Sequence, residues 1–323
     1  MWLPLLSIVI GLILLAWSAD RFIDGAAATA FHLGMPPLLV GLLIIGFGTS
    51  APEMVVSALA AIQGSPGLAL GNAYGSNVAN IGLILGVVAL LSPLAVHGQL
   101  LRLELPVLGA VTLLSGALLL DGTISRIDSA LLLFLLAAVV VLSILRARRR
   151  ARKQPVDLDE SRTAGQGMSL RQGMIWTGFG LVVLVASSRL LVWGAVSVAE
   201  AMGVSDLIIG LTVVAIGTSL PELASSISAV RKREHDMVLG NVVGSNLYNT
   251  LGVVGLAGVI APIHTASEAL YRDWPVMAAL TLVMALFCLG RGGPGRILRW
   301  QAALLLMAYL GYNAYLIGSA LTV

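Results

Sequence analysis

Two six-residue stretches decide the architecture of this chain: GTSAPE at 48–53 and GTSLPE at 217–222. Two longer stretches follow them at equal distances, GNAYGSNVAN at 71–80 and GNVVGSNLYN at 240–249. The members of both pairs are 169 positions apart. A constant offset over two separate motifs predicts a duplicated unit without internal insertions.

The composition indicates a membrane protein. Hydrophobic residues make up 58% of the 323 positions and charged residues only 11%, with a mean hydropathy of +0.96. A soluble domain is closer to half apolar and a quarter charged, so this chain needs lipid as its solvent. The basic residues lie in short loops, which argues against a nucleic-acid partner. The single cysteine, Cys288, excludes an intramolecular disulfide and a cysteine-rich metal site.

Apolar stretches of about 20 residues can cross a bilayer as helices. Ten are expected, five on each side of a polar segment. No Lys or Arg precedes the first, so we interpret it as a spanning helix and not as a signal peptide. The expected cores are 3–30, 38–62, 69–92, 102–120, 127–146, 173–201, 206–230, 237–261, 274–290 and 298–321.

The chain is therefore expected to contain a first five-helix repeat at 1–146, a linker at 147–171 and a second five-helix repeat at 172–323. The linker begins with a basic run at 148–153 and shows no helical or strand period, so we expect it to be solvated. Its charges are expected to hold it in the cytoplasm. Binding of anionic lipid is the alternative role for the basic run.

Loop charges predict the orientation. With the linker in the cytoplasm, alternation of ten spans places all but three of the 19 Lys and Arg residues inside, the exceptions being Arg126, Arg189 and Arg272. This pattern predicts a multi-pass protein of the inner (plasma) membrane with both termini outside the cytoplasm. Because each repeat has an odd number of spans, the second is inverted relative to the first. The expected fold class is an all-α integral membrane protein of ten helices in two inverted five-helix repeats.

The repeated motif carries a carboxylate into each half of the membrane domain. Glu53 and Glu222 fall inside the second and seventh spans, where an ionisable group indicates function. Pro52 and Pro221 each remove a backbone donor and free a carbonyl one turn earlier, near Gly48 and Gly217. Such carbonyls are ligands for hard cations. Protonated glutamic acids in interhelical hydrogen bonds are the structural alternative.

Hydroxyl and amide groups surround these glutamates in the sequence. Several of these residues lie three or four positions from a glutamate or from each other, and therefore share a helix face. They are Thr49, Ser50, Ser76 and Asn80 in the first half and Thr218, Ser219, Ser245 and Asn249 in the second. Oxygen ligands without His or Cys suit Ca²⁺, Na⁺ or Mg²⁺ and not zinc or copper. For four more asparagines, a role in helix packing and a supporting role at the site are equally expected. They are Asn72, Asn77, Asn241 and Asn246.

The two motifs, GTSxPE followed by GNxxGSN in two inverted copies, resemble the α-repeats of the calcium/cation antiporter superfamily, and most closely its prokaryotic sodium/calcium exchanger branch. The resemblance extends over nearly the whole chain, with the motifs at 46–80 and 215–249. It implies that Glu53 and Glu222 are central ligands shared by calcium and the counter-ion, with Asn80 and Asn249 as further metal ligands. It also implies carbonyl ligands at Gly46 and Ala215, and sliding of the first and sixth helices over a rigid core.

One departure from that pattern concerns the counter-ion. Well-known members carry Asp at one of the positions of Asn80 and Asn249, whereas both are Asn here. The site then has two carboxylates, with a formal charge of −2 when both are ionised. One Ca²⁺ neutralises this charge, whereas three Na⁺ would leave a charge of +1 in a low-dielectric site. Protons or K⁺ therefore remain alternatives to Na⁺.

The sequence thus predicts a secondary antiporter that exchanges Ca²⁺ for Na⁺ by alternating access. A passive cation channel is a less favoured alternative. An enzyme is not expected, because no nucleophile or metal-binding cluster of His and Cys is present. Neither a cofactor nor an obligate protein partner is expected; the partners are the lipid bilayer and the transported cations. Arg189 lies within the sixth span, where Glu200 or an acidic lipid would balance its charge.

Overall fold

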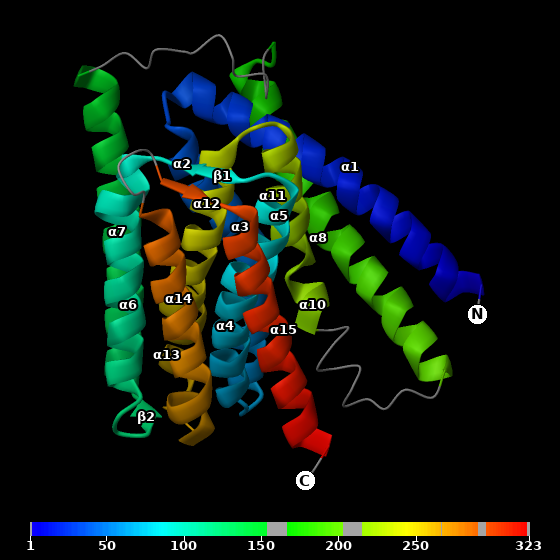
Figure 1. Ribbon diagram of the computed structural model, residues 1–323, viewed down its shortest axis with the longest axis vertical. Coiled ribbons are helices and arrows are strands. Elements are labelled where there is room, and N and C mark those ends of the chain that lie inside the picture. The colour runs from blue at the N-terminus through cyan, green and yellow to red at the C-terminus, as the bar shows by residue number, and fades with distance from the viewer. Residues whose placement is uncertain (1, 154–166, 203–214, 266, 290–294, 322–323) are drawn as a thin grey trace.

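The computed structural model describes residues 2–153, 167–202, 215–265, 267–289 and 295–321 as an elongated bundle of helices (Figure 1). Within this part of the chain, 9 helices are long and apolar enough to cross a membrane. The protein is therefore a multi-span membrane protein. The expected span at 206–230 begins outside the described residues, and only its second part, from residue 215 onward, is seen.

The first half contains five such helices; two of them are interrupted by a π-helical segment and a third begins with one. The elements are α1 (Trp2–Leu33); α2 (Pro37–Val40), η1 (Gly41–Ile45) and α3 (Gly46–Ile62); α4 (Gly67–Ala79), η2 (Asn80–Leu85) and α5 (Gly86–Leu91); η3 (Leu100–Glu104) and α6 (Leu105–Leu118); and α7 (Arg126–Lys153). Segments η1 and η2 adjoin the two motifs, as π-helical turns in helices frequently do at functional sites.

The second half repeats this order. Its elements are α8 (Leu170–Ala201); α10 (Ala215–Thr218) and α11 (Leu220–Arg231); α12 (His235–Leu247), η5 (Tyr248–Val253) and α13 (Val254–Ile260); η6 (Ala269–Asp273) and α14 (Trp274–Cys288); and α15 (Arg299–Leu321). Two short antiparallel strand pairs join the halves at their ends: β1 (Leu94–Val96) with β4 (Gly295–Ile297), and β2 (Thr123–Ile124) with β3 (Ile263–His264).

The linker begins later than the sequence predicts. Helix α7 continues to Lys153, through the whole of the basic run for which no regular structure is expected. Arg, Lys and Ala are good helix formers, so a polar composition does not end a helix that already has an apolar stretch to start from. Helix α8 begins at Leu170 with a capping box, in which the Ser169 hydroxyl accepts from the Gln172 backbone N–H. Residues 154–166 of the predicted linker lie outside the described residues.

Helices α1 and α8 lie against each other along one side of the bundle (Figure 1), and their contacts are reciprocal. Gly180 of α8 lies against Phe22 of α1, and Gly11 of α1 lies against Leu191 of α8. Each residue of the first contact is 169 positions from its counterpart in the second. A contact repeated with the partners exchanged is the mark of a two-fold relation.

Small residues also bring the motif helices together. Gly41 leaves room for the backbone of α12 at Met237, and Gly240 leaves room for the backbone of α2 at Leu38. Such close helix contacts are typical of membrane bundles. They hold the second span of the first half against the third span of the second half, and this contact positions the polar motif residues.

Candidate functional site

The two motif glutamates are buried inside the bundle. Glu53 belongs to α3 and Glu222 to α11, and the two residues are only 4% and 3% exposed. Their carboxyl groups lie within electrostatic range of each other, although the residues come from different halves of the chain. Two acids at this depth require compensation by positive charge or by protonation.

Four of the predicted ligand oxygens are buried and have no hydrogen-bond partner. They are Oγ of Ser50, Oε2 of Glu53, Oε2 of Glu222 and Oδ1 of Asn249. Buried polar atoms are almost always paired, and leaving one unpaired costs about 1–3 kcal/mol. All four are oxygen atoms of the kind that hard cations bind. The unsatisfied groups therefore fit a cation as their missing partner.

Thr49 connects the two halves beside the glutamates. Its hydroxyl donates to the Ile45 carbonyl at 3.0 Å and approaches Oδ1 of Asn241 at 3.5 Å. It also interacts with the Glu222 carboxyl group. Ser245 approaches the same Asn241 oxygen at 3.5 Å. These contacts place the motif hydroxyls of α3 and α12 next to the second glutamate.

The asparagines divide into two groups by their contacts. Asn80 donates its Nδ2 to Oδ1 of Asn246 at 2.9 Å, and Asn77 donates to the Thr250 hydroxyl at 2.8 Å. Both bonds cross between the halves. Asn249 differs, because its Oδ1 has no partner at all. The two positions that the motif treats as equivalent, 80 and 249, are therefore not equivalent in the structure.

Asn72 and Asn241 make the same contact in each half. Asn72 donates to the Ser57 hydroxyl at 3.1 Å, and Asn241 donates to the Ser226 hydroxyl at 2.9 Å. Ser57 and Ser226 are also 169 positions apart. These bonds fix the third span of each half to the helix that carries the glutamate.

The backbone carbonyl groups predicted near the ion site differ in their side-chain contacts. The Gly217 carbonyl accepts a hydrogen bond from the Ser188 hydroxyl of α8 at 3.0 Å. The Gly46 carbonyl, at the start of α3, has a long side-chain contact of 3.5 Å with the Thr49 hydroxyl. Ala215 is the first residue of α10, with its carbonyl at the start of the described part of this span.

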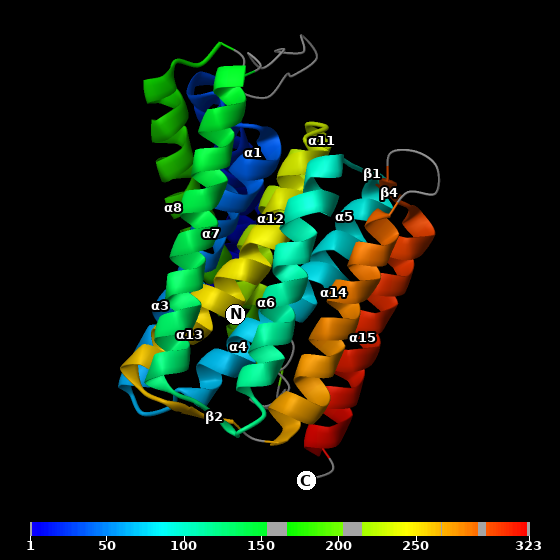
Figure 2. The ribbon, with the colours of Figure 1, turned by 90° about the vertical axis from the view of Figure 1, so that its left-hand side faces the viewer.

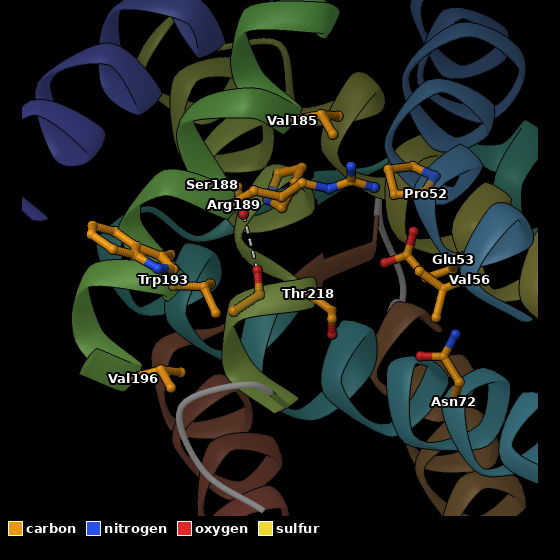
Figure 3. Close-up of a pocket in the computed structure, with 13 residues that line it drawn as sticks. Pro52, Glu53, Val56, Asn72, Val185, Ser188, Arg189, Trp193, Val196 and Thr218 are labelled. Carbon is orange, nitrogen blue, oxygen red and sulfur yellow. Dashed lines mark hydrogen bonds between the residues drawn. The ribbon is translucent and has the colours of Figure 1, made fainter. Parts of the chain in front are cut away.

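A cavity of about 380 Å³ ends at Glu53 (Figure 3). Its wall along α8 runs from Val185 to Val196, toward the end of α8 that is remote from α7. The polar residues of its lining are Glu53, Asn72, Ser188, Arg189 and Thr218.

A second cavity of about 290 Å³ lies between α4, η6 and α15. Ser76, Asn72 and Thr218 line it, so Asn72 and Thr218 belong to both cavities. Its other polar wall is Asp273, which accepts hydrogen bonds from Tyr312 at 2.8 Å and from Arg272 at 2.6 Å. Two predicted ligands, Ser76 and Thr218, thus face open space.

Arg189 is the residue whose surroundings differ most from expectation. The sequence predicts Glu200 or lipid as its partner, but its side chain extends across the first cavity toward Pro52 and Glu53 (Figure 3). A signal was present in the sequence, because a charged residue in mid-span is rarely turned to lipid. The sequence could not tell which neighbour it faces.

These features define a multi-span membrane protein whose two halves jointly enclose two buried carboxylates. The family model described as "Sodium/calcium exchanger protein" matches residues 3–145 and 173–318. The chain therefore belongs to the sodium/calcium exchanger family, a family of membrane cation antiporters. This confirms the resemblance drawn from the two motifs.

Similar proteins extend over almost the full length of this chain. A putative antiporter, CaxA, from Alkalimonas amylolytica is 43% identical over 312 residues, which are 97% of this chain and 98% of CaxA. The inner membrane protein YrbG from Escherichia coli is 39% identical over 90% of both chains. A solved structure of the sodium-calcium exchanger NCX_Mj superimposes with a TM-score of 0.81 at 31% identity, covering 97% of this chain and 98% of that one.

Proposed function

We propose that this protein exchanges Ca²⁺ for Na⁺ across the membrane by alternating access, with Glu53 and Glu222 as ligands shared by the two ions. The observation that carries the proposal is the set of four buried oxygens without partners, two of which belong to the glutamates. A cation bound between the halves satisfies these atoms and balances the two carboxylates. The name of NCX_Mj supports sodium and calcium as the ions.

The ligand set we propose extends from these four atoms to the neighbouring oxygens. Asn80, Asn249 and the two glutamates bind the divalent ion most directly. The flanking positions are lined by Gly46, Thr49, Ser50, Ser76, Ala215, Thr218, Ser219 and Ser245. Ca²⁺ takes six to eight oxygen ligands in a flexible arrangement, which suits a mixture of carboxylate, hydroxyl, amide and carbonyl groups.

Two inverted repeats of five helices form the proposed architecture, with the span at 206–230 as the tenth helix. The reciprocal contacts of α1 with α8 and the matching Asn72–Ser57 and Asn241–Ser226 bonds support it. Inverted repeats place the substrate site at their interface near the bilayer centre.

We propose that ions reach this site from one side of the membrane. The residues of α8 and α15 that line the two cavities belong mostly to the C-terminal halves of these helices. Helix α15 ends on the opposite side of the bundle from the C-terminal end of α7 (Figures 1 and 2), and so does α8 (Figure 1). With the 147–171 segment in the cytoplasm and both termini outside, this conformation is open to the outside. We place the protein in the inner membrane, which the name of YrbG supports.

Transport into proteoliposomes tests the proposal. Purified protein is reconstituted, and ⁴⁵Ca²⁺ uptake against its gradient is measured while Na⁺, K⁺ and H⁺ gradients are imposed one at a time. A Na⁺ gradient is expected to drive uphill uptake. Uptake that is only downhill under all three gradients would refute exchange and favour a passive channel.

A Ca²⁺/H⁺ or K⁺-coupled exchanger is the second candidate. The observation that favours it is Asn at both 80 and 249, which leaves two carboxylates to balance the counter-ions. Uphill uptake driven by the H⁺ or the K⁺ gradient, and not by Na⁺, identifies this alternative in the same assay. In either case we propose a transporter that needs no enzyme activity, cofactor or protein partner.

A further inference from the structure

Arg189 brings a permanent positive charge to the wall of the cavity that ends at Glu53. It lies on α8, is exposed, and directs its guanidinium across the cavity toward the acidic residue (Figure 3). A guanidinium remains protonated at physiological pH, whereas a buried lysine can lose its proton. The charge of Arg189 is therefore a constant part of the site's electrostatics.

Arg189 acts on Glu53 without contacting it. The two groups are within electrostatic range, but the ion pairs found among the described residues do not include them. A long side chain that borders open space can cross the remaining gap by changing rotamer. The structure thus shows a cation and a carboxylate on the wall of the same cavity.

The other half of the protein has no such cation at the matching position. The residue 169 positions before Arg189 is Asp20, which accepts a hydrogen bond from Ser228. Packing of the repeat therefore does not require a cation at this place. In the second half, the neighbouring Ser188 bonds to the Gly217 carbonyl and so fixes this level of α8 beside the motif.

Charge balance gives Arg189 a role in transport. The two ionised glutamates carry a formal charge of −2, and Asn80 and Asn249 add nothing. One Ca²⁺ balances the pair by itself. Without Ca²⁺, the arginine supplies one positive charge, and one monovalent ion supplies the other. The site therefore has no net charge with Ca²⁺ alone, or with the arginine and one monovalent ion. A neutral site can move through the low-dielectric interior at a small cost in electrostatic free energy.

We propose that Arg189 is a tethered cation of the transport site, which neutralises Glu53 when Ca²⁺ is absent and withdraws along the cavity when Ca²⁺ binds. Arg189 takes the place of one monovalent ion. The protein therefore exchanges one monovalent counter-ion per Ca²⁺, whereas its two glutamates alone would require two. This inference rests on the proposed exchange function. It adds a residue that sets the stoichiometry.

Replacement of Arg189 tests this role. Wild type and Arg189→Gln are reconstituted, and the membrane potential at which net Ca²⁺ flux reverses is measured under fixed Ca²⁺ and counter-ion gradients. We expect the coupling ratio and the Hill coefficient for the counter-ion to rise by about one in Arg189→Gln, since one positive charge must be replaced. Removing a competing charge should also tighten Ca²⁺ binding, measured in detergent without transport, by about tenfold.

Two control variants separate charge from structure. Arg189→Lys keeps the charge and is expected to retain the wild-type coupling ratio. Arg102→Gln removes an exposed arginine outside both cavities and should change neither ratio nor affinity. If Arg189→Gln fails to fold, as judged by its thermal transition, Arg189→Ala replaces it.

The two proposals fail in different ways. Wild-type exchange with an unchanged coupling ratio and an unchanged Ca²⁺ affinity in the neutral variant would overturn the tethered cation alone. The tethered cation is also overturned if Arg189→Lys behaves like Arg189→Gln, because the charge would then not be the cause. Absence of exchange in the wild type would overturn the proposed function itself.

Discussion

The same motif lies on differently built helices in the two halves. In the first half, α3 continues from Gly46 to Ile62 with Pro52 in its interior. In the second half, α10 ends at Thr218, Ser219 adopts a non-helical φ of −91° and ψ of 4°, and α11 begins at Leu220. Proline is tolerated in the first turn of a helix, so Pro221 fits the start of α11. Pro52, in contrast, interrupts the backbone hydrogen bonds inside α3.

This difference shows that the duplicated sequence does not give a symmetrical site. Gly217 and Thr218, at the helix break, line the first cavity, whereas the corresponding Gly48 and Thr49 do not. Thr49 is instead fully buried against the second half. The glycine and threonine of the second motif thus line the first cavity, whereas the threonine of the first motif is buried between the halves.

The largest expected effect comes from replacing either glutamate, because the two carboxylates together balance the charge of the bound cation. Glu53→Gln and Glu222→Gln are each expected to reduce exchange by on the order of 100-fold or more, since a buried charged ligand to the ion is lost. Initial rates of ⁴⁵Ca²⁺ uptake measure this, with thermal stability as the control for folding. Undiminished transport in both variants would refute the site.

The next effect distinguishes the two asparagine positions. Asn80→Asp replaces the amide that donates to Asn246 and sets a carboxylate against its Oδ1, so we expect about 1–3 kcal/mol of destabilisation. Asn249→Asp changes a residue whose Oδ1 is unpartnered and should be tolerated, with tighter Ca²⁺ binding. Thermal transitions and Ca²⁺ titrations measure both. Equal destabilisation by the two variants would contradict this asymmetry.

Ser188→Ala makes the second half resemble the first, where Ala19 occupies the corresponding position. The variant loses the bond to the Gly217 carbonyl, which is worth about 0.5–1.5 kcal/mol. We expect Ca²⁺ affinity to change by a factor of about 2 to 10 and the fold to persist, because Gly217 lines the first cavity. Ala19→Ser is the matched control and should leave affinity unchanged.

The smallest effect concerns an ion pair that the repeat does not reproduce. Lys232 contacts Asp24 at 2.6 Å between α11 and α1, and the corresponding positions in the other copy are Gln63 and Trp193. Both partners are partly exposed, so the pair contributes about 1 kcal/mol or less. Asp24→Asn should shift the ratio of Ca²⁺ affinities measured from the two faces of oriented vesicles by about fivefold at most.

A double-variant cycle makes that last measurement specific. Asp24→Asn and Lys232→Met should each give the same shift, and the double variant should give no more than either alone. Additive shifts would show that the two residues act independently and that the pair does not hold α1 in place.

Several features could be predicted from sequence because each depends on pattern alone. Apolar stretches of spanning length predicted the membrane class, and the offset of 169 predicted the duplication. The oxygen ligands of the motif predicted a site for hard cations and led to the family. The start of the linker was predicted less well, since α7 continues to Lys153, where helix propensity prevails over polarity.

The sequence by itself thus determined that the protein lies in a membrane, that it is built from two related halves, and that Glu53 and Glu222 are its central acidic residues. Only the tertiary structure decided which oxygens lack partners, which motif residues line the cavities, where the second motif breaks, and that Arg189 faces Glu53. The physical reason is that hydropathy and repetition are properties of the order of residues in the chain. The partners of a buried polar group are chosen by helices that are distant in sequence and meet only on folding.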